Sequence, residues 1–341
     1  MNVRIVLFPF ALMYGIVVYI RNMCYDLGIL KSFSIPKKSI CVGNLSVGGT
    51  GKTPLVAYIA QLLIENNQPT SILSRGYGRK TKGFRWVKKE DNADLCGDEP
   101  LIYANRFESV NVAVCEKRKD GIQVIQKEFP SNEVILLDDA FQHRAVKAGF
   151  SILVTDYKHP FSSDYLLPVG NLRESKNGRN RADIIVVSKC PKNLSEQEKS
   201  ALTKQLKFNP KSVFFSQIHY ENPICFGTPI QSVEKYVLVT GIANPKPLIE
   251  QIGIEKIVEH IEFPDHYAFT ANDIQQIHQK FDTFADGKTI LLTTEKDFMR
   301  LRNYLSEWKL HSYPWYFQPI SVVIDREIEF KNLITTYVGK I

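Results

Sequence analysis

The sequence predicts an α/β fold in which a mainly parallel sheet carries helices on both faces. Three observations support this prediction. Short β-branched runs alternate with helical stretches, a glycine-rich turn joins one run to a helix-like stretch, and a second series of runs follows residue 210. We therefore expect a large α/β domain, a smaller C-terminal α/β lobe and an apolar N-terminal helix.

The length and composition of the chain fit this division. Its 341 residues exceed the usual size of one domain, and apolar residues at 44% are enough to fill two cores. The predicted boundaries are 1–35 for the N-terminal helix region, 36–210 for the main domain and 211–341 for the smaller lobe. The six cysteines form no C-x-x-C pair and no metal-ligand spacing, which is typical of reduced thiols in a cytosolic protein.

The first predicted element is an apolar helix over residues 5–20, bracketed by Arg4 and Arg21. Such a helix reaches about 24 Å, short of the roughly 30 Å hydrocarbon core of a bilayer. No small-residue cleavage site follows the run convincingly, so a removed signal peptide is not expected. Basic flanks and aromatic residues favour an anchor that lies in, or dips partly through, an anionic membrane surface. A hydrophobic helix packed on the domain is the alternative.

The predicted strands of the main sheet share β-branched or aliphatic residues. They are expected at 39–42, 70–73, 110–115, 134–137, 151–154 and 183–188. A polar helical stretch over 191–210 is predicted as the bridge to the second lobe. The strands of that lobe are expected at 212–218, 236–240, 256–263, 289–292 and 321–324. A cleft between two lobes is a common place for a substrate.

A glycine-rich turn over 42–53 separates the first strand from a helix-like stretch. Glycines let backbone N–H groups point toward a phosphate, a lysine reaches the outer phosphates, and a hydroxyl at the helix N-terminus ligates Mg²⁺. This pattern predicts a P-loop that binds a nucleoside triphosphate. The predicted nucleotide-binding residues are Gly48, Gly49, Thr50, Gly51, Lys52, Thr53 and Pro54.

This loop departs from the usual G-x-x-x-x-G-K-[ST] pattern because Ser46 stands where a glycine is expected. Residues 47–53 instead resemble the compact GG-x-GK-[ST] loop of partitioning-type ATPases, with Val47 in the place of their signature lysine. That lysine works across a dimer, so its absence counts against such an ATPase. An ordinary glycine-rich turn is the structural alternative, but such a turn does not require Lys52 and Thr53 directly after the last glycine.

A basic segment without acidic residues covers 75–89, and glycines interrupt it. Its composition favours a hairpin or flap, around 75–90, over a phosphorylated substrate. A solvated basic face is the alternative. Nucleic acid is not expected as a partner, because the segment is brief and the net charge of the whole chain is only +7.

Two acidic residues, Asp138 and Asp139, follow the apolar strand 134–137 directly. They lie where the carboxyl end of a strand meets the phosphate loop. Mg²⁺ bound to nucleotide phosphates takes one or two protein carboxylates beside the loop hydroxyl of Thr53. We therefore predict a magnesium site at this edge of the sheet.

Two further acids, Asp98 and Glu99, lie in a tight turn that can start a helix, where capping is the alternative role. The second lobe supplies His266, in a loop stiffened by proline and aromatic residues, where a structural histidine is the alternative. If the lobes close, a carboxylate and the imidazole would pair. The acid would then take a hydroxyl proton and the histidine would tune it.

These segments together resemble one family closely, the tetraacyldisaccharide 4'-kinases, which phosphorylate the lipid A precursor. The resemblance covers nearly the whole chain. It rests on six motifs in register, over residues 42–53, 74–77, 97–100, 138–144, 170–174 and 263–267. One departure is Ala140, where the family usually has glycine, and we expect its methyl group to need only a modest backbone adjustment.

The resemblance implies transfer of the γ-phosphoryl group of ATP to the 4'-hydroxyl of a tetraacylated glucosamine disaccharide 1-phosphate, with Mg²⁺ as the metal. It places the enzyme at the cytoplasmic face of a bacterial inner membrane, anchored through the N-terminal helix, with no obligate protein partner. Such an anchor suits the substrate, because lifting its acyl chains out of the bilayer would cost ~0.8 kcal/mol for each exposed methylene.

The resemblance also implies roles for single residues. Asp98 would act as the base with His266 as its partner, and Lys52 would hold the phosphates. The residues implied near the metal are Thr53, Asp138, Asp139 and Glu99. The residues implied as contacts to substrate phosphate, sugar or nucleotide are Arg75, Asn171, Arg173 and Arg118.

Two other classes of protein stay open at this point. One is a membrane-recruited, partitioning-type P-loop ATPase without a lipid substrate, against which the missing signature lysine and the additional motifs count. The other is a nucleotide-binding scaffold without turnover, against which the paired acids and Asp98 count.

Overall fold

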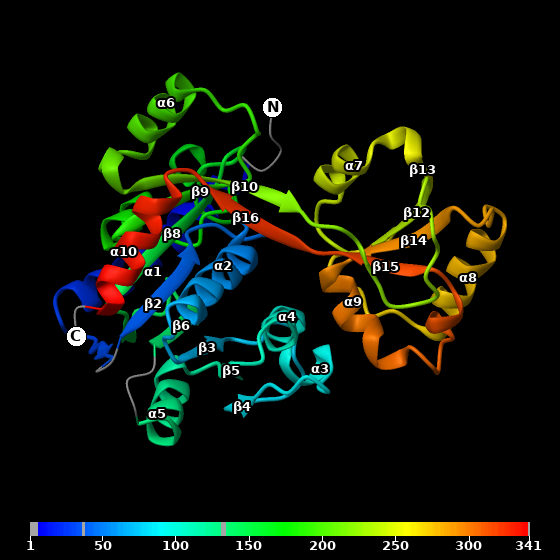
Figure 1. The fold of residues 1–341 in the computed structure, drawn as a ribbon. Coiled ribbons are helices and arrows are strands. Elements are labelled where there is room, and N and C mark those ends of the chain that lie inside the picture. The colour runs from blue at the N-terminus through cyan, green and yellow to red at the C-terminus, as the bar shows by residue number, and fades with distance from the viewer. Residues whose placement is uncertain (1–5, 36–37, 131–133, 340–341) are drawn as a thin grey trace.

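The short aliphatic runs of the sequence form the strands of the protein. These strands need no polar side, because helices cover both faces of a parallel sheet. The computed structural model describes residues 6–35, 38–130 and 134–339, which form two α/β lobes (Figure 1). A nine-stranded sheet underlies the large lobe and a five-stranded sheet the small one. The predicted fold class, a mainly parallel α/β sheet with a smaller second lobe and an N-terminal helix, is confirmed.

The large sheet has the strand order β16-β10-β9-β8-β2-β6-β3-β5-β4. All neighbours are parallel except the two edge pairs, β16 with β10 and β4 with β5. The strands are β2 (Ser39–Asn44), β3 (Thr70–Ser74), β4 (Arg85–Trp86), β5 (Val110–Val114), β6 (Val134–Asp138), β8 (Phe150–Asp156), β9 (Ile184–Ser188), β10 (Val213–Tyr220) and β16 (Ile320–Ile324). Every residue of β2, β3, β6 and β9 is buried, as both faces of the sheet are covered.

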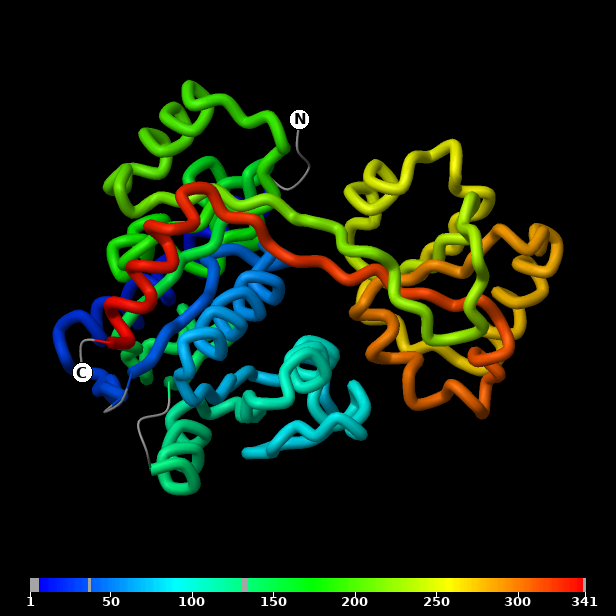
Figure 2. Tube along the Cα trace, in the orientation of Figure 1, coloured from blue at the N-terminus to red at the C-terminus, as the bar shows by residue number. Residues whose placement is uncertain are grey.

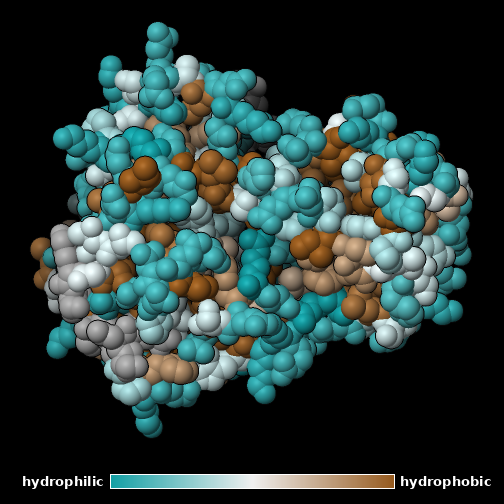
Figure 3. All heavy atoms as spheres, in the orientation of Figure 1, coloured by the Kyte–Doolittle hydropathy of each residue, from teal (hydrophilic) through white to brown (hydrophobic). Residues whose placement is uncertain are grey.

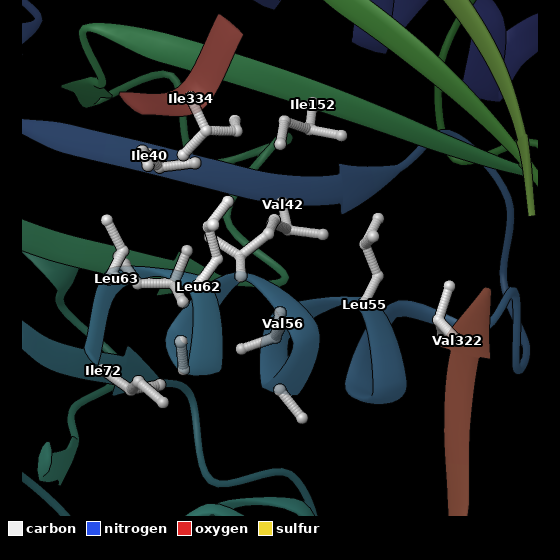
Figure 4. Packing of buried hydrophobic residues seen from close by; sticks show 14 of the residues in the cluster. Ile40, Val42, Leu55, Val56, Leu62, Leu63, Ile72, Ile152, Val322 and Ile334 are labelled. Atoms are coloured by element: carbon white, nitrogen blue, oxygen red, sulfur yellow. The ribbon is translucent and has the colours of Figure 1, made fainter. Parts of the chain in front are cut away.

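Helices pack on both faces of this sheet. One face carries α2 (Lys52–Glu65), α4 (Asp98–Arg106) and α10 (Glu327–Gly339), and the other carries α5 (Arg118–Glu128) and α6 (Glu196–Leu206). Figure 4 shows the first face, where aliphatic side chains of α2, such as Val56, meet those of β2, such as Val42. Smaller elements of this lobe are α3 (Ala93–Cys96), β1 (Phe33–Ser34), β7 (Val146–Lys147), and the 3₁₀ turns Phe161–Ser163, Lys176–Arg181 and Pro210–Ser212.

The small lobe has the strand order β11-β15-β14-β12-β13, parallel except for the edge strand β11. Its strands are β11 (Ile224–Cys225), β12 (Lys235–Thr240), β13 (Ile257–Glu262), β14 (Thr289–Thr294) and β15 (Trp315–Gln318). Its helices are α7 (Lys246–Ile252), α8 (Ala271–Asp282) and α9 (Glu295–Leu301), with 3₁₀ turns at Ile254–Lys256, Arg302–Tyr304 and Leu310–Ser312. Trp315 lies fully buried in the core of this lobe.

Two strands connect the lobes. The chain leaves the large lobe along β10 and returns along β16, and the two strands pair antiparallel from Ser216 opposite Ile324 to Tyr220 opposite Ile320 (Figure 2). The structure therefore differs from the division predicted at residue 210, because β10, β16 and α10 all join the large lobe. The polar helix expected as a bridge is α6, which covers the large sheet instead. A β-branched run looks alike in sequence whichever sheet it joins.

The N-terminal helix α1 (Phe8–Asp26) lies on the large lobe with most of its apolar side chains in solvent. Ala11 is its buried residue, whereas Met13 and Val17 are each 66% exposed. None of the helices within the described residues is both long enough and apolar enough to cross a membrane. Arg4, predicted as a basic flank, lies outside the described residues. The helix thus presents an apolar surface that the lobe does not cover.

Candidate active site

The phosphate loop connects the end of β2 to the first residue of α2. Gly48 and Gly51 have φ values of 97° and 79°, and a Cβ atom on Gly51 would lie 3.3 Å from that of Ser188. The loop is fixed by two contacts to Thr50, because Asn44 Nδ2 donates to its Oγ1 at 2.9 Å and Ser188 Oγ donates to its carbonyl at 2.7 Å. The N-cap residue of α2 is Gly51, which has no side chain that could cap the helix, so the N-terminal backbone N–H groups suit an anion.

Asp138 and Asp139 lie beside this loop because β6 is the parallel neighbour of β2. Asp139 Oδ1 lies 3.4 Å from Lys52 Nζ, and its Oδ2 accepts a hydrogen bond of 3.2 Å from Arg173 Nη1. Asp138 Oδ2 accepts a bond of 3.0 Å from Ser74 Oγ. The lysine of the loop is thus held by an acid at the end of the adjacent strand.

The surroundings of the two aspartates shift their pKa values in opposite directions. Burial and the neighbouring charges of Glu99 and Asp139 raise the pKa of Asp138. Burial also acts to raise the pKa of Asp139, but the cations Lys52 and Arg173 outweigh it and lower that pKa. The buried Oδ1 of Asp138 has no hydrogen-bond partner among the described residues. An oxygen without a donor next to clustered carboxylates fits a hard cation such as Mg²⁺.

Within the described residues, no group of three or more His, Cys, Asp or Glu side chains is arranged to hold a metal by itself. The acids present are therefore suited to a cation whose other ligands are phosphates and water. The binding of a nucleotide-bound Mg²⁺ ion at this edge of the sheet stays a prediction.

Asp98 and Glu99 are the first two residues of α4. Glu99 Oε1 accepts a hydrogen bond of 3.0 Å from Thr53 Oγ1, so the turn at Gly97 and the loop belong to one site. Asp98 is 4% exposed. Of the two acids, Glu99 is the one that contacts the phosphate loop in this structure.

Asp98 also joins the two lobes. His266, in the left-handed region at φ 58°, places Nδ1 3.1 Å from Asp98 Oδ2, and Arg300 Nη2 donates to the same oxygen at 2.5 Å. Burial alone would raise the pKa of Asp98, but the bond with His266 and the charges of Lys296 and Arg300 hold it well below its usual range. The bond to Asp98 in turn raises the pKa of His266. The acid is therefore an ionised acceptor bound to an imidazole.

Two cations at this site, Lys296 and Arg300, were not singled out from the sequence. Both lie on α9 of the small lobe, and Lys296 Nζ donates to Glu99 Oε1 at 2.7 Å. For Lys296, the signal that could have found it is the polar run 295–297 directly after β14, the same pattern that drew attention to Asp138. Arg300 lies outside that run.

The predicted substrate residues lie at different depths. Arg75 is exposed, after the end of β3. Asn171 accepts a hydrogen bond of 2.8 Å from Val47 N through its carbonyl, and Arg173 N donates to Leu45 O at 2.8 Å, so both flank the phosphate loop. Arg118 is 1% exposed, and its guanidinium donates to the carbonyls of Cys115 and Asp138. In this structure Arg118 supports the strand end that carries Asp138, and its contact with substrate stays a prediction.

The helix α1 contacts the same region. Tyr14 Oη donates to the carbonyl of Arg173 at 2.7 Å, and Asn22 Nδ2 donates to Glu174 Oε2 at 3.1 Å. The exposed apolar helix is therefore fixed to the segment that flanks the phosphate loop and bonds Asp139.

A cavity of about 570 Å³ lies where the lobes meet, lined by α2, α4, α9 and the connecting strands. Its lining includes Tyr58, Arg106, Phe298, Phe317 and Pro319. In Figure 3 the surface is hydrophilic over most of both lobes, with small hydrophobic patches beside the junction between them. Within the lining, Arg106 binds Glu295 through Nε to Oε1 at 2.8 Å and through a second, short contact.

Known proteins are similar to this chain in sequence and fold. The family model described as tetraacyldisaccharide-1-P 4'-kinase matches residues 3–339. The tetraacyldisaccharide 4'-kinase of Flavobacterium johnsoniae is 44% identical over 342 residues, covering 98% of this chain and 97% of that protein. The enzyme of the same description from Bacteroides thetaiotaomicron is 42% identical over 314 residues, covering 86% and 82%. A crystal structure of LpxK from Aquifex aeolicus in complex with ATP has a TM-score of 0.75 and 31% identity, covering 98% of this chain and 99% of that one.

Proposed function

The chain belongs to the tetraacyldisaccharide-1-P 4'-kinase family and acts as a kinase of lipid A biosynthesis, and from that premise we propose how its residues perform the transfer. The observation that carries the proposal is the contact between His266 of the small lobe and Asp98 of the large one, at a phosphate loop that Glu99 also touches. This arrangement supports a base close to a phosphate-binding loop.

In this proposal Asp98 accepts the proton of the 4'-hydroxyl of tetraacyldisaccharide 1-phosphate. The hydroxyl oxygen forms a bond to the γ-phosphorus of ATP while the bond from that phosphorus to the β,γ-bridging oxygen breaks, and ADP leaves. His266 keeps Asp98 ionised and aligned through the bond of 3.1 Å. Phosphoryl transfer needs alignment and charge compensation more than covalent help, so an ionised acid of low basicity suffices.

The phosphates would be held by the loop residues 48–54, with Lys52 on the outer phosphates. We propose Thr53, Asp138, Asp139 and Glu99 as the residues that hold Mg²⁺, directly or through water. When bound, Mg²⁺ neutralises charge on the phosphates. The support is that Thr53 contacts Glu99, that Asp139 lies beside Lys52, and that one buried oxygen of Asp138 lacks a donor among the described residues.

We further propose that the substrate approaches from the side of α1. Arg75, Asn171 and Arg173 are the candidates for contact with its phosphate or sugar, and Tyr14 ties the apolar helix to Arg173. The helix would rest in the cytoplasmic surface of a bacterial inner membrane, its exposed apolar side chains among the lipids. A lipid-embedded disaccharide could then be phosphorylated without leaving the bilayer. The proposal includes no nucleic acid and no obligate protein partner.

The test is incubation of the full chain with γ-labelled ATP, Mg²⁺ and tetraacyldisaccharide 1-phosphate in mixed micelles. We expect the label in the lipid, as a 1,4'-bisphosphate. If label is released only as free phosphate, the chain is a P-loop ATPase without a lipid acceptor and the proposed transfer is wrong.

A further inference from the structure

Helix α9 directs two cations across the lobe junction at adjacent acids of α4. Arg300 donates to Asp98 and Lys296 to Glu99, and the two cations are four residues apart, so they lie on one face of the helix. Neither has a role in the predicted site. Their surroundings differ in a way that separates their functions.

Arg300 is committed to protein groups. Besides Asp98, its Nη1 donates to Asp297 Oδ1 at 2.8 Å and to the carbonyl of Gly241 at 3.0 Å. Its side chain is 7% exposed. An arginine bonded to three acceptors in a nearly closed environment holds the lobes together and has little capacity for a ligand.

Lys296 has hydrogen-bond donors left for a ligand. An ammonium group has three donors, and among the described residues Lys296 makes one hydrogen bond, to Glu99 Oε1 at 2.7 Å. Its side chain is 30% exposed. The same Glu99 oxygen accepts the bond from Thr53 Oγ1, the hydroxyl of the phosphate loop. A single carboxylate oxygen therefore connects Lys296 to the residue that follows Lys52.

We propose that Lys296 is a phosphate-binding cation supplied by the small lobe, which contacts the terminal phosphate of ATP and is positioned for that contact by Glu99. Lys52 approaches the phosphates from the large lobe, so the two ammonium groups would bind the transferred phosphoryl group from the two sides of the junction. The site is then complete only when both lobes contribute. This inference rests on the proposed function, since it concerns the same nucleotide.

Electrostatics support this role. Lys296 Nζ forms an ion pair of 2.7 Å with Glu99 Oε1, and Asp98 is the acid next to Glu99 at the start of α4. Clustered carboxylates would otherwise repel a polyphosphate, and a cation bonded to one of them offsets that repulsion. A lysine suits this task because it binds phosphate as a compact point charge.

The experiment compares Lys296→Met and Lys296→Arg in the full chain, with Lys280→Met as the matched control. Lys280 lies in the same lobe and forms an ion pair of 2.6 Å with Glu259, but at an exposed position. Affinities for ATP and for ADP are measured by titration calorimetry with Mg²⁺ and without lipid. We expect Lys296→Met to weaken the binding of ATP at least about tenfold more than the binding of ADP, because a charge-assisted bond to the terminal phosphate is lost.

Lys296→Arg is expected to restore most of the preference for ATP, and Lys280→Met to leave both affinities unchanged. The proposal would be overturned if Lys296→Met lowered the affinities for ATP and ADP equally, or lowered neither. It would also be overturned if the preference for ATP over ADP were lost only because the variant has a lower unfolding temperature. The measurement needs no acceptor. A wild-type chain that prefers ATP through Lys296 but labels no lipid would therefore overturn the proposed function and leave this inference standing.

Discussion

Asp98 shows how neighbouring charges can set the state of a single side chain. Burial would favour its neutral form, yet one imidazole and two cations of the other lobe hold it ionised. The resemblance to the kinase family implied that Asp98 and His266 would pair, because both lie in short motifs that match the family. The sequence could not predict Arg300, because an arginine within a helix carries no local sign of a partner 202 positions away.

The first prediction concerns Asp98 as the base. Asp98→Ala should lower the rate of lipid phosphorylation by several powers of ten and leave ATP affinity largely intact, because the proton acceptor is lost while the phosphate loop remains. His266→Ala should lower the rate of lipid phosphorylation by a somewhat smaller factor. Steady-state kinetics with labelled ATP and calorimetry make the comparison. A loss in Asp98→Ala smaller than the ~10²-fold expected for a base would assign Asp98 to positioning.

The second prediction concerns His278, a buried residue of α8. Its Nε2 accepts a hydrogen bond of 2.9 Å from Trp315 Nε1, and burial lowers its pKa from 6.5 to about 4. The unfolded chain therefore binds a proton at this residue before the folded chain does, and stability falls as pH drops below about 6.5, until about pH 4.

The measurement for His278 is the thermal unfolding midpoint of wild type and His278→Gln at pH 7.5 and pH 5. Glutamine can accept the Trp315 bond through its carbonyl but does not titrate. Between pH 7.5 and pH 5, the free energy of unfolding of the wild type should fall by on the order of 1 kcal/mol more than that of the variant. Parallel losses in both proteins would show that His278 does not couple protonation to folding.

At the scale of elements, the positions of the strands could be predicted from the sequence more closely than the pairing between strands. The runs predicted at 70–73 and 289–292 are β3 and β14, with ends within two residues. The edge strand β11 has only two residues and β15 pairs through a short aromatic run, so neither gave a clear periodic signal. The nonlocal pairing of β10 with β16 is decided by tertiary packing, which no short window of sequence contains.

The third prediction tests the surface of α1. Met13→Glu with Val17→Glu places two charges, one helical turn apart, on side chains that are each 66% exposed. Binding to vesicles that contain anionic lipid should fall more than tenfold, because about 1.5–3 kcal/mol of apolar burial is lost for each side chain. Co-sedimentation with the vesicles measures the effect.

The control for α1 is Ile328→Glu, which adds a charge at a 77% exposed apolar residue of α10. It should leave vesicle binding unchanged, and the unfolding midpoints of both variants should stay near that of wild type. Undiminished sedimentation of the α1 variant would remove this helix as the anchor.

At the scale of the whole molecule, one ion pair fixes the lobes on the side away from Asp98. Arg106 lies at the C-terminal end of α4 and binds Glu295 of α9, and its Nη2 also donates to the carbonyl of Ile320 in β16 at 2.8 Å. The two side chains are 22% and 9% exposed. The helices α4 and α9 are therefore joined at both ends, by Asp98 and Arg300 at one and by this pair at the other.

The fourth prediction is that Arg106→Met lowers the thermal midpoint by several degrees, because Glu295 keeps a nearly buried charge without its partner. The double variant Arg106→Met with Glu295→Met should recover most of the loss. Lys288→Met, which removes an exposed pair with Glu234, should change the midpoint little. If Arg106→Met and Lys288→Met behave alike, the pair does not hold the lobes together.

The insertion of the small lobe between β10 and β16 has a consequence for biosynthesis. The nucleotide-binding lobe lacks β16 and α10 until the small lobe has been synthesised, and Phe330, Ile334 and Val338 of α10 belong to its core. A nascent chain must therefore carry this lobe unfinished, with apolar surface uncovered, while the inserted lobe emerges from the ribosome. The small lobe therefore begins to fold after the large lobe but can complete its fold first.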